Sequence, residues 1–350
     1  MEFKRIAVDT SKYVFPLHGV DVEDRVVLRR NLSRAQFEAF FAKLAPTEVV
    51  LEACGGSHHW GRRLTALGHR VRLIPPQYVK PFVKRSKTDR ADAEAISEAA
   101  ARPSMRFVAV KSGEQQAQAM LLRSRELLVR QRTQLVNALR GHATEFGLVV
   151  AKGIGKVETL LAAVAADPAR PELARETMAF LGEQIAALDQ RLATLEARLL
   201  ALHQASAMSR LLTGIPGVGP ISAISLVLAV DPAQFASGRH LAAWIGLTPR
   251  EHSSGGKQRL GGISRAGNER LRQLLVVGAS AVIRHARAGS KSASPWLLQL
   301  LARKPRKLAA VALANKMART AWALVAHGRE YQREWKDTAP KSCAAQAAAA

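Results

Sequence analysis

Cysteine is nearly absent from this chain of 350 residues, and acidic residues are far fewer than basic ones. The two cysteines, Cys54 and Cys343, lie far apart and form no Cys-x-x-Cys pair. This excludes a zinc site built from thiolates and is typical of a protein from a reducing compartment. With 28 Asp and Glu against 52 Lys and Arg, the net charge is +24. Such an excess attracts polyanions, of which nucleic acid is the most common.

Long apolar runs are also missing from the chain. No window approaches the roughly 20 apolar residues that a membrane-spanning helix needs. The opening Met-Glu-Phe-Lys-Arg does not resemble a signal peptide, so we expect a cytoplasmic protein. No P-loop occurs, and a reaction driven by nucleotide hydrolysis is therefore not predicted. The apolar fraction of 48% is nevertheless ordinary for a globular protein, and the length suggests about two domains.

The positive charge is concentrated toward the C-terminus. Residues 250–336 hold 18 Lys or Arg against four Glu, which is a net charge of +14. A surface that served solubility alone would intersperse charges of both signs more evenly. The distribution therefore indicates a nucleic-acid-binding region in this part of the chain.

The first 111 residues alternate between strand and helix patterns, which predicts an α/β domain. Two predicted strands end on a carboxylate, Asp9 and Glu52. A later helix, with Thr88 as its expected cap, carries Asp89 and Asp92 on one face. Singly, each carboxylate has an ordinary explanation, as a partner of the helix dipole or as a solvated side chain. The strands are expected at residues 4–9, 13–20, 25–28, 48–52 and 70–74, and the helices at 33–44 and 58–67.

Together, the four carboxylates predict a metal site. Hard divalent cations such as Mg²⁺ need oxygen ligands, and two metal ions about 4 Å apart need three or four carboxylates from separate elements. Three strands, a helix and a fourth strand, with acids ending the first and fourth strands, form a ribonuclease H-like arrangement. The two acids of the later helix complete a DEDD set. Residues 1–111 are therefore predicted to form a ribonuclease H-like α/β domain.

From Ser112 on, the sequence predicts helices without strands. We expect a helical or coiled-coil segment at 112–205, a mainly α domain at 206–336, and a disordered tail at 337–350. In the first of these, apolar residues recur alternately four and three apart, as in a coiled-coil seam. The seam would suit a hairpin with residues 113–141, but we favour a contact between two chains. Its members are Leu181, Ile185, Leu188, Leu192, Leu195, Leu199 and Leu202.

A glycine-containing turn marks the start of the C-terminal region. The run Ile215-Pro216-Gly217-Val218-Gly219 lies between two apolar helices and is typical of a helix-hairpin-helix motif. Its glycines, Gly217 and Gly219, would leave backbone N–H groups at a helix start accessible to a phosphate. The alternative is a plain turn between two helices.

Two adjacent serines, Ser253 and Ser254, lie in a glycine-rich stretch that begins at Gly246. Alone, this stretch would be typical of a polar surface loop. Glycine also lets a ligand approach the backbone closely, and a serine hydroxyl is a potential nucleophile. A third serine, Ser264, is better explained as a helix cap. Nearby cations that we expect to contact nucleic acid are Arg250, Lys257, Arg259, Arg265, Arg270 and Arg272.

Five segments, in order along the chain, resemble one known family. They are Asp9-Thr10-Ser11-Lys12, Glu52-Ala53-Cys54-Gly55, Lys87-Thr88-Asp89-Arg90-Ala91-Asp92, Ile215-Pro216-Gly217-Val218-Gly219, and Gly246-Leu247-Thr248-Pro249 with Ser254-Gly255. They resemble the DEDD-type insertion-sequence transposases, also called bridge-RNA-guided serine recombinases. The resemblance covers most of residues 3–330.

The resemblance implies an N-terminal domain similar to the junction resolvase RuvC and a C-terminal transposase domain with a catalytic serine. Asp9, Glu52, Asp89 and Asp92 would bind the metal ion, with Mg²⁺ as the expected cofactor. Ser254 would be the nucleophile, although a shift of the register by one residue would select Ser253. The implied reaction cuts and rejoins DNA during transposition. The implied partners are DNA, a guide RNA and further copies of the chain.

Two functions of other classes stay open on the residues alone. In a metal-dependent nuclease or Holliday-junction resolvase, the carboxylates would support cleavage by water and the serine would be incidental. In a non-catalytic nucleic-acid-binding protein, the helical hairpin and the basic C-terminal region would suffice. Covalent attachment to DNA distinguishes the recombinase from the nuclease, and strand breakage distinguishes both from the binding protein.

Overall fold

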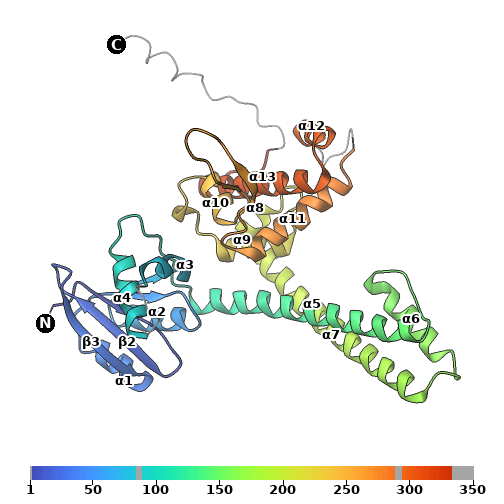
Figure 1. Ribbon diagram of the computed structural model, residues 1–350, viewed down its shortest axis with the longest axis horizontal. Helices are drawn as coiled ribbons and strands as arrows, with labels where there is room; N and C mark the ends of the chain where they lie inside the picture. The colour runs from blue at the N-terminus through green and yellow to red at the C-terminus, as the bar shows by residue number, and fades with distance from the viewer. Residues whose placement is uncertain (1, 84–88, 288–293, 333–350) are drawn as a thin grey trace, which may run out of the picture. The chain divides into compact units, whose positions relative to one another are not determined.

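The computed structural model describes residues 2–83, 89–287 and 294–332 (Figure 1). The side chain of Asp89 is not described. Thr88, Cys343 and the expected tail at 337–350 lie outside the described residues. The chain divides into two compact units, residues 1–120 and 121–350.

The first unit is built on a five-stranded mixed sheet in the order β3-β2-β1-β4-β5. β2 is antiparallel to both β1 and β3, whereas β4 is parallel to both β1 and β5. The predicted mixed α/β character of this region is confirmed. The strands are β1 (Arg5–Val8), β2 (Val14–Val20), β3 (Val26–Ser33), β4 (Glu48–Glu52) and β5 (Arg70–Ile74).

Helices cover both faces of this sheet. On one face, α1 (Arg34–Phe41) and α2 (Ser57–Ala66) close an aromatic core in which Phe15 and Trp60 meet edge to face. α1 begins at the expected cap, Ser33. On the other face, α4 (Asp89–Ala100) packs small and apolar side chains against β1, β4 and β5. Between β5 and α4 lie α3 (Pro76–Val79) and the 3-10 helix η1 (Lys80–Phe82).

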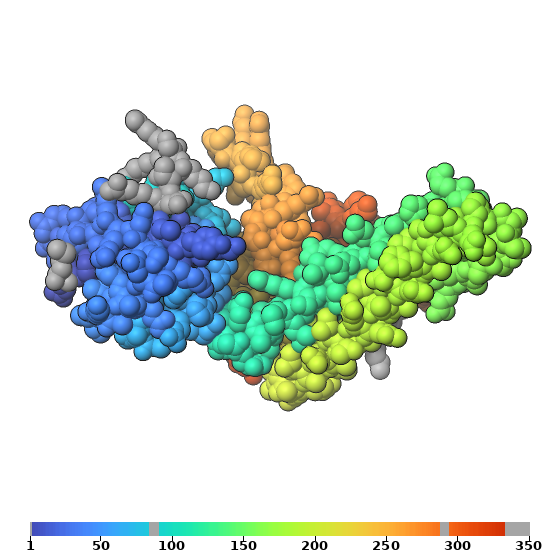
Figure 2. Space-filling view, turned by 90° about the horizontal axis from the view of Figure 1, so that it is seen from below, coloured from blue at the N-terminus to red at the C-terminus, as the bar shows by residue number. Residues whose placement is uncertain are grey.

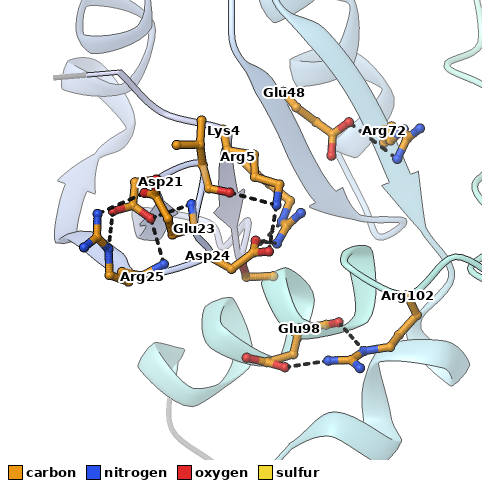
Figure 3. A network of polar contacts seen from close by, with 12 residues as sticks. Lys4, Arg5, Asp21, Glu23, Asp24, Arg25, Glu48, Arg72, Glu98 and Arg102 are labelled. Carbon is orange, nitrogen blue, oxygen red and sulfur yellow. Dashed lines mark hydrogen bonds and ion pairs between the residues drawn. The ribbon is translucent and has the colours of Figure 1, made fainter.

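Ion pairs brace the sheet edge where β1 begins (Figure 3). The Asp24 carboxylate accepts hydrogen bonds from Lys4 at 2.7 Å and from the buried Arg5 guanidinium at 3.0 Å. Arg5 also donates to the Ser97 hydroxyl at 3.5 Å. Because Ser97 lies late in α4 and Arg5 lies at the start of β1, α4 runs opposite to β1. The first turn of α4 is thus directed toward the far edge, where β1 ends.

The second unit contains a long helical arm (Figure 1). α5 (Gly113–Glu145) enters it, α6 (Val157–Ala165) lies near its end after the 3-10 helix η2 (Ile154–Lys156), and α7 (Glu172–Ala205) returns. Ion pairs join Arg125 to Glu196 and Arg132 to Asp189, each at 2.5 Å. The partner numbers rise in α5 as they fall in α7, so the two helices are antiparallel.

The heptad leucines of α7 pack within the chain. Ile185 joins a core cluster with α5 and α6, and Leu199 packs with Leu122 of α5 and Ile224 of α9 (Pro220–Ala229). Leu188 and Leu192 are also buried within the single chain. Our preference for a seam between two chains is therefore not supported by the packing, which is that of an intramolecular hairpin.

The rest of the second unit is a helical bundle around α11 and α13 with one β-hairpin. The hairpin, β6 (Pro249–Glu251) and β7 (Leu260–Ile263), shows that the expectation of no strands after Ser112 was wrong. None of the described helices is long and apolar enough to span a membrane. The helices are α8 (Ala207–Leu212), α9 (Pro220–Ala229), α10 (Gly238–Trp244), α11 (Glu269–Arg284), α12 (Pro295–Arg303) and α13 (Arg306–His327), with the 3-10 helix η3 (Pro232–Gln234).

Candidate active site

Two of the four carboxylates lie on neighbouring strands of the first unit. Val8 of β1 pairs with Leu51 of the parallel strand β4, and the next residues are Asp9 and Glu52. Both are half-buried. The carboxyl ends of adjacent parallel strands lie about 4.8 Å apart. The topology therefore places Asp9 and Glu52 side by side at one edge of the sheet.

Asp92 lies on the helix that crosses the same strands. It precedes the buried Ala95 and Ile96 by three and four residues, so it shares their sheet-facing side of α4. Asp92 is half-buried, and the direction of α4 points its first turn toward the end of β1. Asp89 is the first residue of α4, but its side chain is not described.

The structure does not gather these acids into a finished metal site. Among the described residues, no group of three or more His, Cys, Asp or Glu lies close enough together to hold a metal ion. The residue types nevertheless suit a hard cation, since the donors of this edge are carboxylate oxygens from a strand end, a second strand end and a facing helix.

A contact that the sequence did not reveal joins the two loops next to Asp9 and Glu52. The Thr10 hydroxyl and the Cys54 thiol lie 2.9 Å apart. The Cys54 thiol is also 3.8 Å from the Thr10 carbonyl oxygen. This pair connects the loop after β1 with the loop after β4.

The two serines of the second unit lie at the tip of the β6–β7 hairpin. Ser254 and Lys257 face each other across a two-residue turn, in which Gly255 has φ 56° and Gly256 has φ 75°. Two successive residues with positive φ are typical of a type I′ turn, and glycine adopts this conformation without strain. Every residue from 250 to 262 is exposed.

The two hydroxyls differ in their partners. The Ser253 hydroxyl donates to the Glu251 carboxylate at 2.9 Å and accepts from the Arg259 backbone N–H at 3.0 Å. Ser253 therefore connects the two strands of the hairpin. The Ser254 hydroxyl has no hydrogen-bond partner within the described parts of the chain. Of the two, Ser254 presents the hydroxyl that is available to a ligand.

The base of the hairpin is fixed in the helical bundle. A Cβ on Gly267 would lie 1.7 Å from the Trp244 carbonyl oxygen, so the two segments approach as closely as only glycine permits. The buried Arg272 guanidinium donates at 2.8 Å to the carbonyls of both Ile245 and Ala266. The base of the hairpin is thus fixed by contacts with α10 and α11, whereas its tip is exposed (Figures 1 and 2).

Ser264 is not a helix cap, contrary to our expectation. Its hydroxyl accepts from the Ala266 N–H at 3.4 Å, within the return segment of the hairpin. The helix begins later, and Asn268 caps α11 by accepting from the Leu271 N–H at 3.0 Å. The Ser264 backbone pairs with Thr248 instead, which belongs to the hairpin stem.

The six cations expected to bind nucleic acid fall into two groups. Arg270 and Arg272 have internal partners: Arg270 contacts Glu126 and the Leu122 carbonyl, and burial lowers its pKa. The guanidinium groups of these two arginines are therefore engaged by contacts within the protein, and their binding of nucleic acid stays a prediction. The exposed group consists of Arg250, Lys257, Arg259 and Arg265.

The expected helix-hairpin-helix segment is a compact turn between α8 and α9. Gly217 has φ 88°, and a Cβ there would lie 2.8 Å from the Gly278 carbonyl oxygen of α11. Close packing against α11 therefore requires a glycine at position 217. Gly219 directly precedes α9 and has open space around its Cα. Of the two glycines, Gly219 is the one that a ligand can approach.

Comparison with known proteins identifies the family. Residues 209–294 match the transposase family IS116/IS110/IS902, and residues 6–147 match a DEDD-type transposase domain. A putative transposase of Sinorhizobium fredii is 54% identical over 94% of this chain and 86% of its own length. The transposase for insertion sequence element IS1111A of Coxiella burnetii is 42% identical over 95% of this chain and 92% of its own. The pilin gene-inverting protein of Moraxella bovis is 25% identical over 81% and 82%.

The chain belongs to the IS110/IS116 family of insertion-sequence transposases. It is therefore an enzyme that acts on DNA. The match to the DEDD-type domain also suggests a divalent metal ion. The family assignment confirms the resemblance drawn from the five segments.

Proposed function

We propose that this transposase cuts and rejoins DNA through a covalent bond to Ser254. The supporting observation is the difference between the two hydroxyls of the hairpin tip. Ser253 is bonded within the hairpin, whereas Ser254 is exposed without a partner in the described chain. The relative named as a pilin gene-inverting protein agrees with this proposal, because inversion of a DNA segment requires strands to be rejoined after cutting.

The proposed chemistry is an exchange of phosphate esters. The Ser254 oxygen attacks phosphorus and loses its proton, a serine–phosphate ester forms, and the leaving deoxyribose oxygen takes up a proton. In the second step, a deoxyribose hydroxyl attacks the same phosphorus and Ser254 recovers its proton. Because one ester replaces another in each step, no external energy source is required.

Asp9, Glu52, Asp92 and Asp89 are the residues that we propose to hold Mg²⁺. The support is the adjacency of Asp9 and Glu52 and the approach of α4 from the facing side. When bound, the metal ion would stabilise negative charge on a phosphate. The sheet order, with three antiparallel strands followed by two parallel ones, supports a ribonuclease H-like, RuvC-like assignment for this unit. We propose residues 1–111, 112–205 and 206–336 as the functional domains of the chain.

The exposed hairpin cations and Gly219 form the DNA-binding surface that we propose for the second unit. Arg250, Lys257, Arg259 and Arg265 lie on or beside the exposed strands, within reach of a phosphate backbone near Ser254. The turn before α9 supports a helix-hairpin-helix-like contact. We also propose that a guide RNA directs the reaction, supported by the family resemblance and the charge of +24.

We further propose that the transposase acts as a homo-oligomer. The buried seam of α7 does not provide the contact, but other apolar side chains of the same helix are exposed. Leu173 is 75% and Phe180 is 57% exposed. Such side chains are typical of surfaces that associate. Sedimentation of Phe180→Lys against the wild-type protein tests this: an unchanged oligomer would exclude Phe180 from the interface.

The covalent step is tested by trapping protein–DNA adducts under denaturing conditions. Ser254→Ala should abolish the adduct and strand exchange while leaving DNA binding intact, because the hairpin cations are unchanged. Its free energy of unfolding should change by less than about 0.5 kcal/mol, as is usual for an exposed site. Ser253→Ala is the matched control and should retain the adduct, since its hydroxyl serves the hairpin.

Two results would contradict the assignment. An adduct that persists in Ser254→Ala and disappears in Ser253→Ala would transfer the role of nucleophile to Ser253. Mg²⁺-dependent nicking without an adduct in the wild-type protein would favour a nuclease, the second candidate function, which the carboxylates at the ends of β1 and β4 support. DNA binding without any strand breakage would leave only the binding function.

A further inference from the structure

The turn between β1 and β2 carries an exposed aromatic side chain that the fold does not use. Tyr13 is 69% exposed and directly precedes β2. Its ring contacts the Lys12 ammonium group, which lies 5.3 Å from the ring centroid. Within the described chain, the Tyr13 hydroxyl has no hydrogen-bond partner and Lys12 has no acidic partner. Packing of the hydrophobic core therefore does not explain why either side chain is present.

The backbone under this pair is held in place. The Ser11 hydroxyl accepts from the Val14 N–H at 3.1 Å and also donates to the Val14 carbonyl. The Tyr13 carbonyl accepts from the Arg34 N–H at 2.9 Å, which ties the turn to the start of α1. The ring is therefore presented on a fixed support, so little backbone order has to be gained when a ligand binds.

The pair lies at the same edge of the sheet as the proposed metal ligands. The Asp9 N–H donates to the Pro16 carbonyl at 3.2 Å, so Asp9 faces Pro16 across the two strands. Tyr13 precedes Pro16 by three residues, which is a separation of about 10 Å at 3.3 Å per residue. An ordered phosphate backbone that reaches Asp9 would pass within reach of this turn.

We propose that Lys12 and Tyr13 bind one unpaired nucleotide of the nucleic-acid substrate. The Tyr13 ring stacks on the base, and the Lys12 ammonium group contacts a phosphate. An aromatic ring on a rigid support beside an unpaired cation is the combination that binds single strands, because every base has a face to stack on. The bases of an intact duplex are stacked on one another, so the ligand is a single-stranded or flipped nucleotide. DNA and RNA share this chemistry. The proposal rests on the proposed function in one respect only, namely that the carboxylates near this turn bind a metal ion at the substrate.

The test measures binding without catalysis. The full-length protein is titrated in EDTA against single-stranded DNA and RNA oligonucleotides of one sequence, each with 2-aminopurine at a single position. Tyr13→Ala should weaken binding about 5- to 100-fold, as expected for the loss of one stacked base, and should abolish the quenching of 2-aminopurine. Tyr13→Phe keeps the ring and should retain both signals. Lys12→Ala should reduce the salt dependence of log K by about 0.7.

Matched controls separate this site from a general surface effect. Val22→Ala removes another exposed apolar side chain, 62% exposed, at the opposite edge of the same sheet. Lys43→Ala removes an exposed cation that follows α1. Neither should change affinity or quenching. Unchanged affinity and quenching in Tyr13→Ala on both oligonucleotides would overturn the proposal, as would an equal loss in Val22→Ala. A loss on only one of them would support the proposal and identify the natural ligand. Binding in EDTA does not depend on Ser254. A failure of this proposal would therefore not affect the proposed reaction.

Discussion

At the scale of single residues, two arginines near the hairpin serve different purposes although both carry the same charge. Arg272 is buried and donates to two backbone carbonyls at the base of the hairpin. Arg265 is exposed and follows β7 in a left-handed conformation, with φ 56°. The sequence predicted both as ligands of nucleic acid, because charge alone does not tell whether a guanidinium has partners inside the protein.

Removing the buried guanidinium should destabilise the protein. Arg272→Ala leaves the buried Ile245 carbonyl and the partly buried Ala266 carbonyl without this donor, so the free energy of unfolding should fall by about 2–4 kcal/mol. Urea denaturation measures this change. Arg265→Ala, the control, should alter stability by less than about 0.5 kcal/mol while weakening DNA binding. Equal stabilities of the two variants would show that the carbonyls at the base do not depend on Arg272.

The buried His18 should make the first unit sensitive to acid. Burial lowers its pKa below the usual 6.5; Glu94 and Glu98 oppose this shift, whereas Arg29 and Arg5 add to it. The unfolded chain therefore binds a proton at this position more readily than the folded chain. Stability from the neutral imidazole is complete above pH 6.5 and decreases as the pH falls below it. In urea denaturation, His18→Gln should lose less stability than the wild type between about pH 7.5 and 5.5. An identical loss would contradict this role.

At the scale of elements, the central strands could be predicted because their apolar residues are continuous or alternate and are bounded by polar turns. The strand Glu48–Glu52 is an example: its three central residues are fully buried. The sequence placed Asp9 and Glu52 at strand ends, whereas the parallel pairing that brings these ends side by side came from the structure. The β6–β7 hairpin was not predicted because its strands are short and exposed and β7 contains two glycines, so no apolar period marks them. The partner of the apolar seam of α7 was not predicted either, because a heptad pattern does not show whether the partner helix lies in the same chain.

The turn of the hairpin should control catalysis more than stability. Gly255 and Gly256 both have positive φ, which Ala adopts only at a cost of about 1 kcal/mol each. Replacing both by Ala should displace Ser254 and reduce strand exchange by at least about 10-fold, since misplacement by about 1 Å can cost 100-fold. Gly255→Asn with Gly256 unchanged suits the same turn and should retain activity.

The readouts are strand exchange and urea denaturation of each variant. Because the tip is exposed, the change in unfolding free energy should stay within about 2 kcal/mol, so both proteins remain folded. Full activity with Ala at both positions would mean that the position of Ser254 does not depend on the turn geometry. Loss of activity in Gly255→Asn would mean that the glycines serve another purpose, such as close approach of a ligand.

At the scale of the whole molecule, the cations that carry the excess positive charge differ in whether they have acidic partners. Some cations have acidic partners, such as Arg125 with Glu196 and Arg132 with Asp189 on the arm. Others are exposed with no acidic partner in the described chain, such as Lys257 and Arg259 of the hairpin. The corner between α12 and α13 adds a third group of exposed cations, Arg303, Lys304, Arg306 and Lys307. The net charge of +24 alone could not separate these groups.

The salt dependence of DNA binding should distinguish these groups. Each phosphate contact that a cation makes adds about 0.9 to the slope of log K against log salt concentration for duplex DNA. Lys257→Gln with Arg259→Gln should therefore lower the slope by about 1.8 if both cations contact phosphates. Lys304→Gln with Lys307→Gln tests the corner in the same way. The control is Arg125→Gln with Arg132→Gln, which removes as much charge but takes it from ion pairs. An equal drop in all three double variants would show that affinity follows total charge, and the unpaired cations of the hairpin would then have no special place in binding.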